Sequence, residues 1–234
     1  MGDNINNLNF SSLAQMTKFI FVFLLIFSSC TTYDTEKKLN SNLTVTDCFT
    51  QEEIKDLAKL LDFFNEQIGV SKGMDKKEII ECYDSFVERM YETMETGNFD
   101  IRISFDKQKE IYNQISDSLF NQIWRFGERH IWERDSPSGT FKYSDTLRYI
   151  DCRMDGKYAK FLKEFGKENE MAEAYSESLE TSGGISPTLI FGILRIKKHH
   201  QYDLNDIRLQ LVLAIHYLTL NDQYERKEKY YSIK

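Results

Sequence analysis

The sequence predicts a mainly α-helical protein, folded as an irregular multi-helix bundle. In several separate stretches, apolar residues recur at intervals of three and four, which is the spacing of one helix face. Glycines end most of these stretches, and the 234 residues include only two prolines, so long helices are unobstructed. The length allows one sizeable core or two small lobes, and we expect it within residues 46–221.

The first two helices are predicted from their start signals. Thr50 and Glu53 form a capping-box pattern, and the apolar stripe behind them indicates a helix over about 51–68. Asp75 with Glu78 repeats this signal and opens a second stripe of similar length. The two segments together predict a helical hairpin.

The middle of the chain combines one extended segment, two helices and a loop. Residues 99–105 alternate apolar and polar side chains, but no second clear strand follows, so we interpret them as an extended connector. Helical spacing then covers 106–116 and 117–132, and the aromatic stripe of the second stretch is more typical of a core than of a stacking platform. Residues 133–153 form the longest irregular stretch, and loops of this length are often functional or mobile.

Helical spacing resumes in the last third of the chain. It covers 158–165 and 171–179, each followed by glycine, and Ser186 before Pro187 is typical of the start of a short helix through Ile196.

The last long helix is predicted from Asp203 to Leu220. It is apolar nearly all round, which indicates a place in the middle of the bundle. Within it, His216 is expected to be a hydrogen-bonded structural histidine rather than a ligand or a base. Residues 222–234 form a charged tail that we expect to fray.

The N-terminal region has the features of an export signal. Phe19–Phe27 are nine apolar residues preceded by Lys18, too few for the roughly 20 that a membrane-spanning helix needs. Two small residues, Ser28 and Ser29, follow, and then Cys30. In these residues the chain resembles a bacterial lipoprotein precursor, whereas the remaining domain resembles no characterised family.

The resemblance implies cleavage before Cys30, acylation of that thiol and attachment to a bacterial membrane, facing the periplasm or the cell surface. Residues 1–29 would then be the signal peptide, and residues 30–45 the lipid-attachment site followed by a polar, flexible tether. Because residues 1–15 carry no basic charge, translation from Met16 would give a more compact signal.

The charge of the chain restricts its partners. The formal net charge is −7, and removal of residues 1–29 leaves it unchanged, because Asp3 and Lys18 leave together. Proteins that bind nucleic acid gather Lys and Arg on one face, so we expect no nucleic-acid partner. An acidic domain at a membrane is compatible with a basic protein partner. The sequence does not indicate the oligomeric state.

Three cysteines besides Cys30 leave the disulfide question open. An oxidising compartment would permit one bond among Cys48, Cys82 and Cys152, and three buried thiols are an equal alternative. A simple helical hairpin would hold Cys48 and Cys82 on the order of 20 Å apart, too far for a disulfide.

Four carboxylates are candidates for a cation site or for contact with a basic partner. They recur along one helix face, but an acidic row without a ligand-gathering loop is more typical of a solvated surface. These residues are Glu170, Glu173, Glu177 and Glu180.

The remaining histidines do not predict a metal site. His199 and His200 are adjacent and would project in different directions, and His130 lacks the Glu-x-x-His spacing of di-iron bundles. We therefore expect no metal and no cofactor.

No catalytic residue can be assigned from the sequence. Gly-x-Ser-x-Gly and a glycine-rich phosphate loop are absent from the sequence, and paired carboxylates cannot be recognised by spacing. The interpretation we favour is a membrane-anchored, non-enzymatic module that binds a protein or envelope component through its acidic face or residues 133–153. One version is an inhibitor or immunity protein. The alternative is an envelope hydrolase acting on cell-wall glycan through paired carboxylates.

Overall fold

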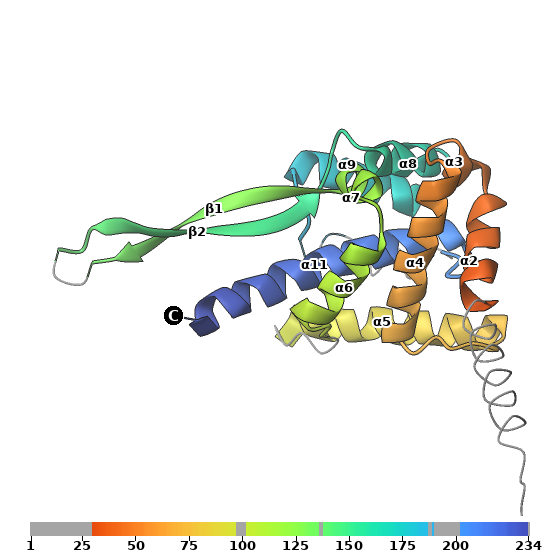
Figure 1. Cartoon of the computed structure of the whole chain (residues 1–234), viewed down its shortest axis with the longest axis horizontal. Coiled ribbons are helices and arrows are strands. Elements are labelled where there is room, and N and C mark those ends of the chain that lie inside the picture. The colour runs from red at the N-terminus through yellow and green to blue at the C-terminus, as the bar shows by residue number, and fades with distance from the viewer. Residues whose placement is uncertain (1–29, 97–101, 136–137, 187–188, 190–201, 234) are drawn as a thin grey trace, which may run out of the picture.

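The computed structural model describes residues 30–96, 102–135, 138–186, 189 and 202–233, and most of them are helical (Figure 1). This confirms the prediction of a mainly α-helical chain. The described residues also contain a two-stranded antiparallel sheet, which was not predicted. Within these ranges, no helix is both long enough and apolar enough to cross a membrane.

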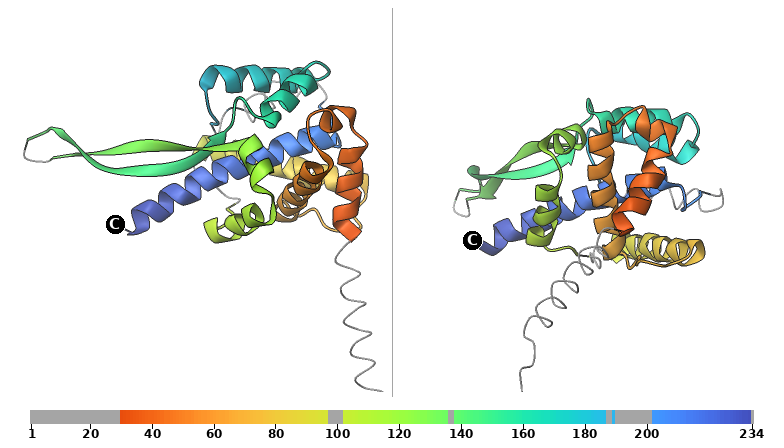
Figure 2. Two further views of the ribbon diagram at one scale, coloured as in Figure 1. Left: turned by 45° about the horizontal axis from the view of Figure 1, so that its top comes forward. Right: turned by 45° about the vertical axis from the view of Figure 1, so that its right-hand side comes forward.

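The two helices predicted from their start signals are present as α4 (Gln51–Gln67) and α5 (Lys76–Thr96). The capping box of α4 is complete, with the Thr50 N–H donating to Glu53 Oε2 at 2.8 Å. However, α5 runs across the end of α4 rather than alongside it, so the predicted hairpin is wrong (Figures 1 and 2). At this contact the ring of Phe64 on α4 lies 5.1 Å from that of Phe86 and 6.1 Å from that of Tyr83, both on α5.

The segment predicted to be a flexible tether is largely helical. It forms α2 (Cys30–Asn40) and the short α3 (Leu43–Thr46), with Leu39 and Val45 fully buried. The folded domain therefore begins before residue 46. The prediction failed because each of these helices buries very few apolar residues, and so no sustained period is visible in the sequence.

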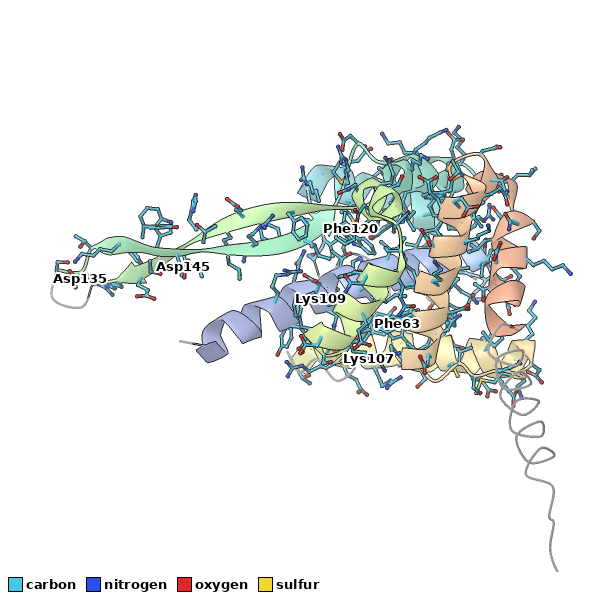
Figure 3. The ribbon with its side chains drawn as sticks, in the orientation of Figure 1. Phe63, Lys107, Lys109, Phe120, Asp135 and Asp145 are labelled. Carbon is cyan, nitrogen blue, oxygen red and sulfur yellow. The ribbon has the colours of Figure 1, made fainter. Side chains whose placement is uncertain are left out.

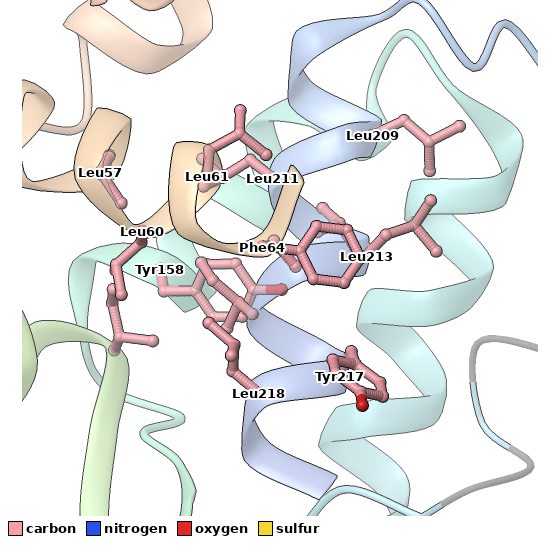
Figure 4. Packing of buried hydrophobic residues seen from close by; sticks show 14 of the residues in the cluster. Leu57, Leu60, Leu61, Phe64, Tyr158, Leu209, Leu211, Leu213, Tyr217 and Leu218 are labelled. Carbon is pink, nitrogen blue, oxygen red and sulfur yellow. The ribbon is translucent and has the colours of Figure 1, made fainter. Parts of the chain in front are cut away.

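The last helix, α11 (Ile207–Ile233), passes through the centre of the core, as predicted (Figure 4). It begins four residues later than expected, because the Asp203 carboxylate accepts from the Asn205 N–H at 2.9 Å and forms a turn. Figure 4 shows α4 and α11 residues meeting in this core: Leu57, Leu60, Leu61, Phe64, Leu209, Leu211, Leu213, Tyr217 and Leu218.

The charged tail is helical rather than frayed at its start. The α11 helix continues to Ile233, and Asp222 is fully buried, with the Arg226 guanidinium donating to it at 2.8 Å. The helix therefore continues across the boundary predicted at residue 222, and the ion pair four residues apart contributes to this continuation.

Two short helices lead to the sheet and two follow it. α6 (Phe105–Gln114) and α7 (Asp117–Ile123) are each capped by a serine, and α8 (Lys157–Gly166) and α9 (Glu170–Ser182) confirm the predicted spacing. Of the expected extended connector, residues 99–101 lie outside the described residues, residues 102–104 belong to neither helix nor strand, and Phe105 begins α6. The helix expected from Ser186 to Ile196 lies outside the described residues apart from Ser186 and Leu189.

The sheet lies where the sequence predicts the end of the helix 117–132 and the irregular segment 133–153. It consists of β1 (Trp124–Arg134) and β2 (Phe141–Cys152). Of the four positions that indicate one long helix, Phe120 and Ile123 lie on α7, which ends at Ile123, whereas Trp124 and Ile131 lie on β1. Beyond α7, aromatic residues occupy alternate positions of β1, and Gly127 lowers the helix propensity.

Candidate functional site

The β1–β2 hairpin projects beyond the helical body (Figures 1 and 2). Its strands pair antiparallel, with Trp124 opposite Cys152 at the root and Arg134 opposite Phe141 toward the tip. A bulge shifts the register between Ile131 and Trp132. We call residues 124–152 the arm.

The root of the arm is fixed to the core. Trp124 is fully buried, and its Nε1–H donates to Oγ1 of Thr219 on α11 at 2.7 Å. The ring of Phe120 on α7 lies 5.2 Å from that of Trp124 (Figure 3 shows Phe120 at this junction). On β2, the Ile150 carbonyl accepts from Nε2 of Gln223 at 2.7 Å. Contacts with two helices therefore hold the arm in a defined direction.

The arm carries most of the exposed large apolar side chains. Five such side chains occur among the described residues, and Leu43 is the only one of them that lies on the helical body. The other four are Phe126 (49% exposed), Trp132 (57%), Phe141 (67%) and Tyr143 (54%). Among the described residues, the exposed large apolar side chains are therefore concentrated on the arm.

Three of these residues and a histidine form a surface toward the tip. Directly opposite residues of an antiparallel pair share a face, which places Trp132 beside Tyr143, with ring centroids 5.9 Å apart. The His130 ring lies 5.6 Å from that of Tyr143, whose hydroxyl is 2.7 Å from Thr146 Oγ1. We call His130, Trp132, Phe141 and Tyr143 the aromatic face.

The arm is electrically neutral, although the chain is acidic. It carries five basic and five acidic residues, so the excess of −7 lies outside it. The basic residues are Arg125, Arg129, Arg134, Lys142 and Arg148; the acidic ones are Glu128, Glu133, Asp135, Asp145 and Asp151. Figure 3 places Asp135 and Asp145 along the hairpin.

A polar cluster is buried where the arm meets α8, α9 and α11. His216 is fully buried, and its Nδ1 lies 3.0 Å from the Tyr175 hydroxyl, so the predicted structural histidine is confirmed. Burial lowers the pKa of His216 to about 3, and burial raises the pKa values of Tyr158 and Tyr175 well above their ordinary value. Burial also raises the pKa of the Cys152 thiol. These groups therefore stay neutral in the core at neutral pH.

Two clefts on the helical body have polar walls. The larger, of about 950 Å³, lies between α2, α4 and the start of α5, and includes Asp62 and Glu66. The smaller, of about 340 Å³, lies between α4 and α6 and is lined by Glu66 from one helix and Glu110 from the other. Lys107, which also lines it, donates to Gln67 at 2.9 Å (Figure 3). Among the described residues, these cleft carboxylates are candidates for the hydrolase alternative.

The acidic row of α9 is exposed. Glu180 pairs with Lys163 of α8 at 2.6 Å, so part of its charge is neutralised. Within the described ranges, no group of three or more His, Cys, Asp or Glu side chains could hold a metal ion. The cation interpretation of Glu170, Glu173, Glu177 and Glu180 therefore receives no support.

The three cysteines after Cys30, all among the described residues, form no disulfide. Cys48 and Cys152 are buried, Cys82 is partly exposed on α5, and all three are free thiols. Cys30 begins α2, and its side chain lies outside what the structure describes, as do His199 and His200.

The sequence does not reveal the aromatic face as one surface, because it predicts a helix that ends at Trp132 and places Phe141 and Tyr143 in the irregular segment 133–153. The signal that could have located it is the alternation of Trp124, Phe126, His130 and Trp132 at even positions, against Phe141 and Tyr143 across a turn. No known protein family, curated protein or solved structure matches this chain.

Proposed function

We propose that this protein is an exported lipoprotein, held at a bacterial membrane through acylated Cys30, and that its arm binds a protein or another envelope component. The anchor is supported by the apolar run and small residues that precede Cys30. The observation that carries the binding role is the aromatic face, exposed on a strand pair that projects from the body.

Physical arguments favour a partner for this face. Exposed apolar side chains on a soluble surface are usually scattered singly, and a contiguous group marks an interaction site. Trp and Tyr contribute strongly to binding when buried at an interface, because they present a large and rigid contact area. An isolated two-stranded sheet is also only marginally stable in water, so a partner that covers it would stabilise it.

The position of α2 determines how far from the membrane the arm would lie. Thr35 on α2 donates a hydrogen bond to Asp62 of α4, so only a few residues separate Cys30 from packed structure. An acylated Cys30 would then hold the body close to the lipid surface. The reach of the protein would come from the arm rather than from a tether.

The inhibitor or immunity version implies a different surface. Because the arm is neutral, attraction of a basic partner would depend on acidic residues of the helices, including the α9 row. Binding through the arm should therefore depend weakly on salt, whereas binding of a basic protein should weaken steeply as the ionic strength rises.

The hydrolase alternative would use the smaller cleft, where Glu66 and Glu110 come from different helices. Its test is release of soluble fragments from purified cell wall by the full chain, compared with Glu110→Gln. If the chain released fragments and the variant did not, the hydrolase would replace the binding module as the proposed function.

The binding role is tested by co-purification from detergent-solubilised membranes. The double variant Trp132→Ala/Tyr143→Ala should reduce recovery of specific co-purifying components by at least about tenfold, because it removes two central aromatic contacts. The matched control is Leu43→Ala, which removes an exposed apolar side chain from the body. Equal recovery with all three proteins would show that the aromatic face is not the binding site.

The anchor is tested separately by fractionation. The parent chain should sediment with membranes and carry fatty acid, and Cys30→Ser should lose the acyl label. A parent protein that retains its leader without acyl label would contradict the proposed anchor, and would leave the test of the arm unaffected.

A further inference from the structure

The outer edges of β1 and β2 differ in whether their outward-pointing backbone N–H and C=O groups have hydrogen-bond partners within the arm and α11. In β1, the backbone N–H and C=O groups of odd-numbered residues point toward β2. Just before the strand, the Ile123 carbonyl accepts from the Arg153 N–H at 2.8 Å. Just after it, the Asp135 N–H donates to the Thr140 carbonyl at 2.8 Å. Because the direction alternates along a strand, even-numbered residues direct theirs outward. These residues are Phe126, Glu128, His130, Trp132 and Arg134.

The corresponding edge of β2 is capped. The N–H groups of Thr146 and Cys152 each donate to the preceding aspartate side chain at 2.8 Å. The Ile150 carbonyl accepts from Gln223, because α11 packs along this strand. Natural proteins block exposed sheet edges in this way to prevent pairing with other chains.

The outer edge of β1 faces away from α11. β1 meets α7 at its root, where the rings of Phe120 and Phe126 lie 5.8 Å apart, and beyond that point it projects from the body (Figures 1 and 2). Its outer half therefore offers a strand edge to which another strand can be added.

We propose that the occupant of this edge is β1 of a second copy of the chain, paired antiparallel about a two-fold axis at Ile131. The argument is charge complementarity. In this register Glu128 lies opposite Arg134 of the second copy, and Arg129 lies opposite its Glu133. The two-fold axis repeats both pairs, so every charged residue between Glu128 and Arg134 faces an opposite charge.

Neighbouring registers match less well. The two copies can form backbone hydrogen bonds only if even-numbered residues, whose N–H and C=O groups point outward, lie opposite even-numbered residues. The two-fold axis must therefore pass through a residue and not between two residues. Centred on Arg129, the register aligns Arg125 with Glu133; centred on Trp132, it aligns Arg129 with Asp135. Centred on His130, it aligns only Arg125 with Asp135. Each of these three registers therefore contains one kind of opposite-charge pair, whereas the register centred on Ile131 contains two.

Pairing would join the two hairpins into a four-stranded sheet, which exceeds the minimum of about three strands for an independently stable sheet. The two-fold axis would be perpendicular to this sheet, so both aromatic faces would lie on one side. The inference concerns the edge of the arm and goes beyond the proposed function, which concerns its face; either can fail without the other.

The charge pairing is tested by measuring self-association of the full chain in mild detergent by analytical ultracentrifugation. Arg134→Glu turns two attractive contacts into repulsive ones and should weaken the dimer by about tenfold. Glu128→Arg/Arg134→Glu restores opposite charges in this register and should recover most of the affinity. Lys163→Glu makes the same charge change on α8, away from the arm, and should have no effect.

The register is tested by a disulfide across the axis. Ile131 would face its own copy in a non-hydrogen-bonded pair with Cα atoms about 4.5 Å apart, which is within the range for a disulfide. Ile131→Cys should therefore give a covalent dimer on mild oxidation, whereas the parent chain and Thr146→Cys on the β2 edge should not.

Several outcomes would overturn the proposal. They are a parent chain that remains monomeric at every concentration, a charge-swap variant as weak as Arg134→Glu, and Ile131→Cys that crosslinks no better than Thr146→Cys. Crosslinking of the Ile131→Cys thiol mainly to other proteins would also overturn it, because the occupant would then be a different chain.

Discussion

Replacing Leu39 by alanine tests whether the residues after Cys30 belong to the folded domain. Leu39 lies on α2 with none of its surface exposed, in the same core cluster as Leu57 and Leu61 of α4. Truncating a fully buried leucine removes its transfer free energy and leaves a cavity, so Leu39→Ala should lower the free energy of unfolding by about 3 kcal/mol. The assay is equilibrium unfolding in urea, followed by circular dichroism.

Leu43→Ala provides the matched control for this measurement. Leu43 is four residues away, at the start of α3, and is 78% exposed, so the same substitution should cost less than about 0.5 kcal/mol. A flexible tether would make both substitutions neutral. Equal unfolding free energies for the two variants would therefore refute the assignment of α2 to the core.

Further predictions concern the buried polar cluster and a close backbone contact. Because His216 has a pKa of about 3 in the folded chain and 6.5 when unperturbed, the unfolded chain binds more protons below pH 6.5, and stability falls as the pH falls from 6.5 toward 3. When the pH is lowered from 7 to 5, the free energy of unfolding of the parent should therefore fall by about 2 kcal/mol more than that of His216→Gln. An equal fall in the two proteins would contradict the buried neutral imidazole. At Gly156, a Cβ atom would overlap the Gln122 carbonyl oxygen, so Gly156→Ala should destabilise the chain by about 1–3 kcal/mol in the same assay, and a neutral result would contradict this contact.

The elements that were predicted correctly have local signals. The capping box of Thr50 and Glu53, the apolar sequence of α11, and the glycine after α9 each act within a few residues, so the sequence alone reveals them. Gly183 ends α9 in the left-handed conformation, with φ of 69°, which glycine adopts without strain.

The sequence signal for the arm is weak, because contacts with distant residues hold its root in place. Trp124 continues the helical spacing of α7, and its place in a strand depends on Thr219, 95 positions away in the chain. The two strands also carry charged residues on both faces, which obscures the alternation that indicates a half-buried strand. The sequence therefore predicts a helix and an irregular segment where the structure has the arm.

The most direct test of the binding role is photo-crosslinking in intact cells. A photoreactive residue at Phe141, on the arm, is compared with one at Leu43, the exposed apolar position on the body. We predict a discrete adduct from position 141, heavier than the monomer, and none from position 43. If position 141 gave no adduct, or if both positions gave the same ones, the arm would not be the surface through which this protein binds its partner.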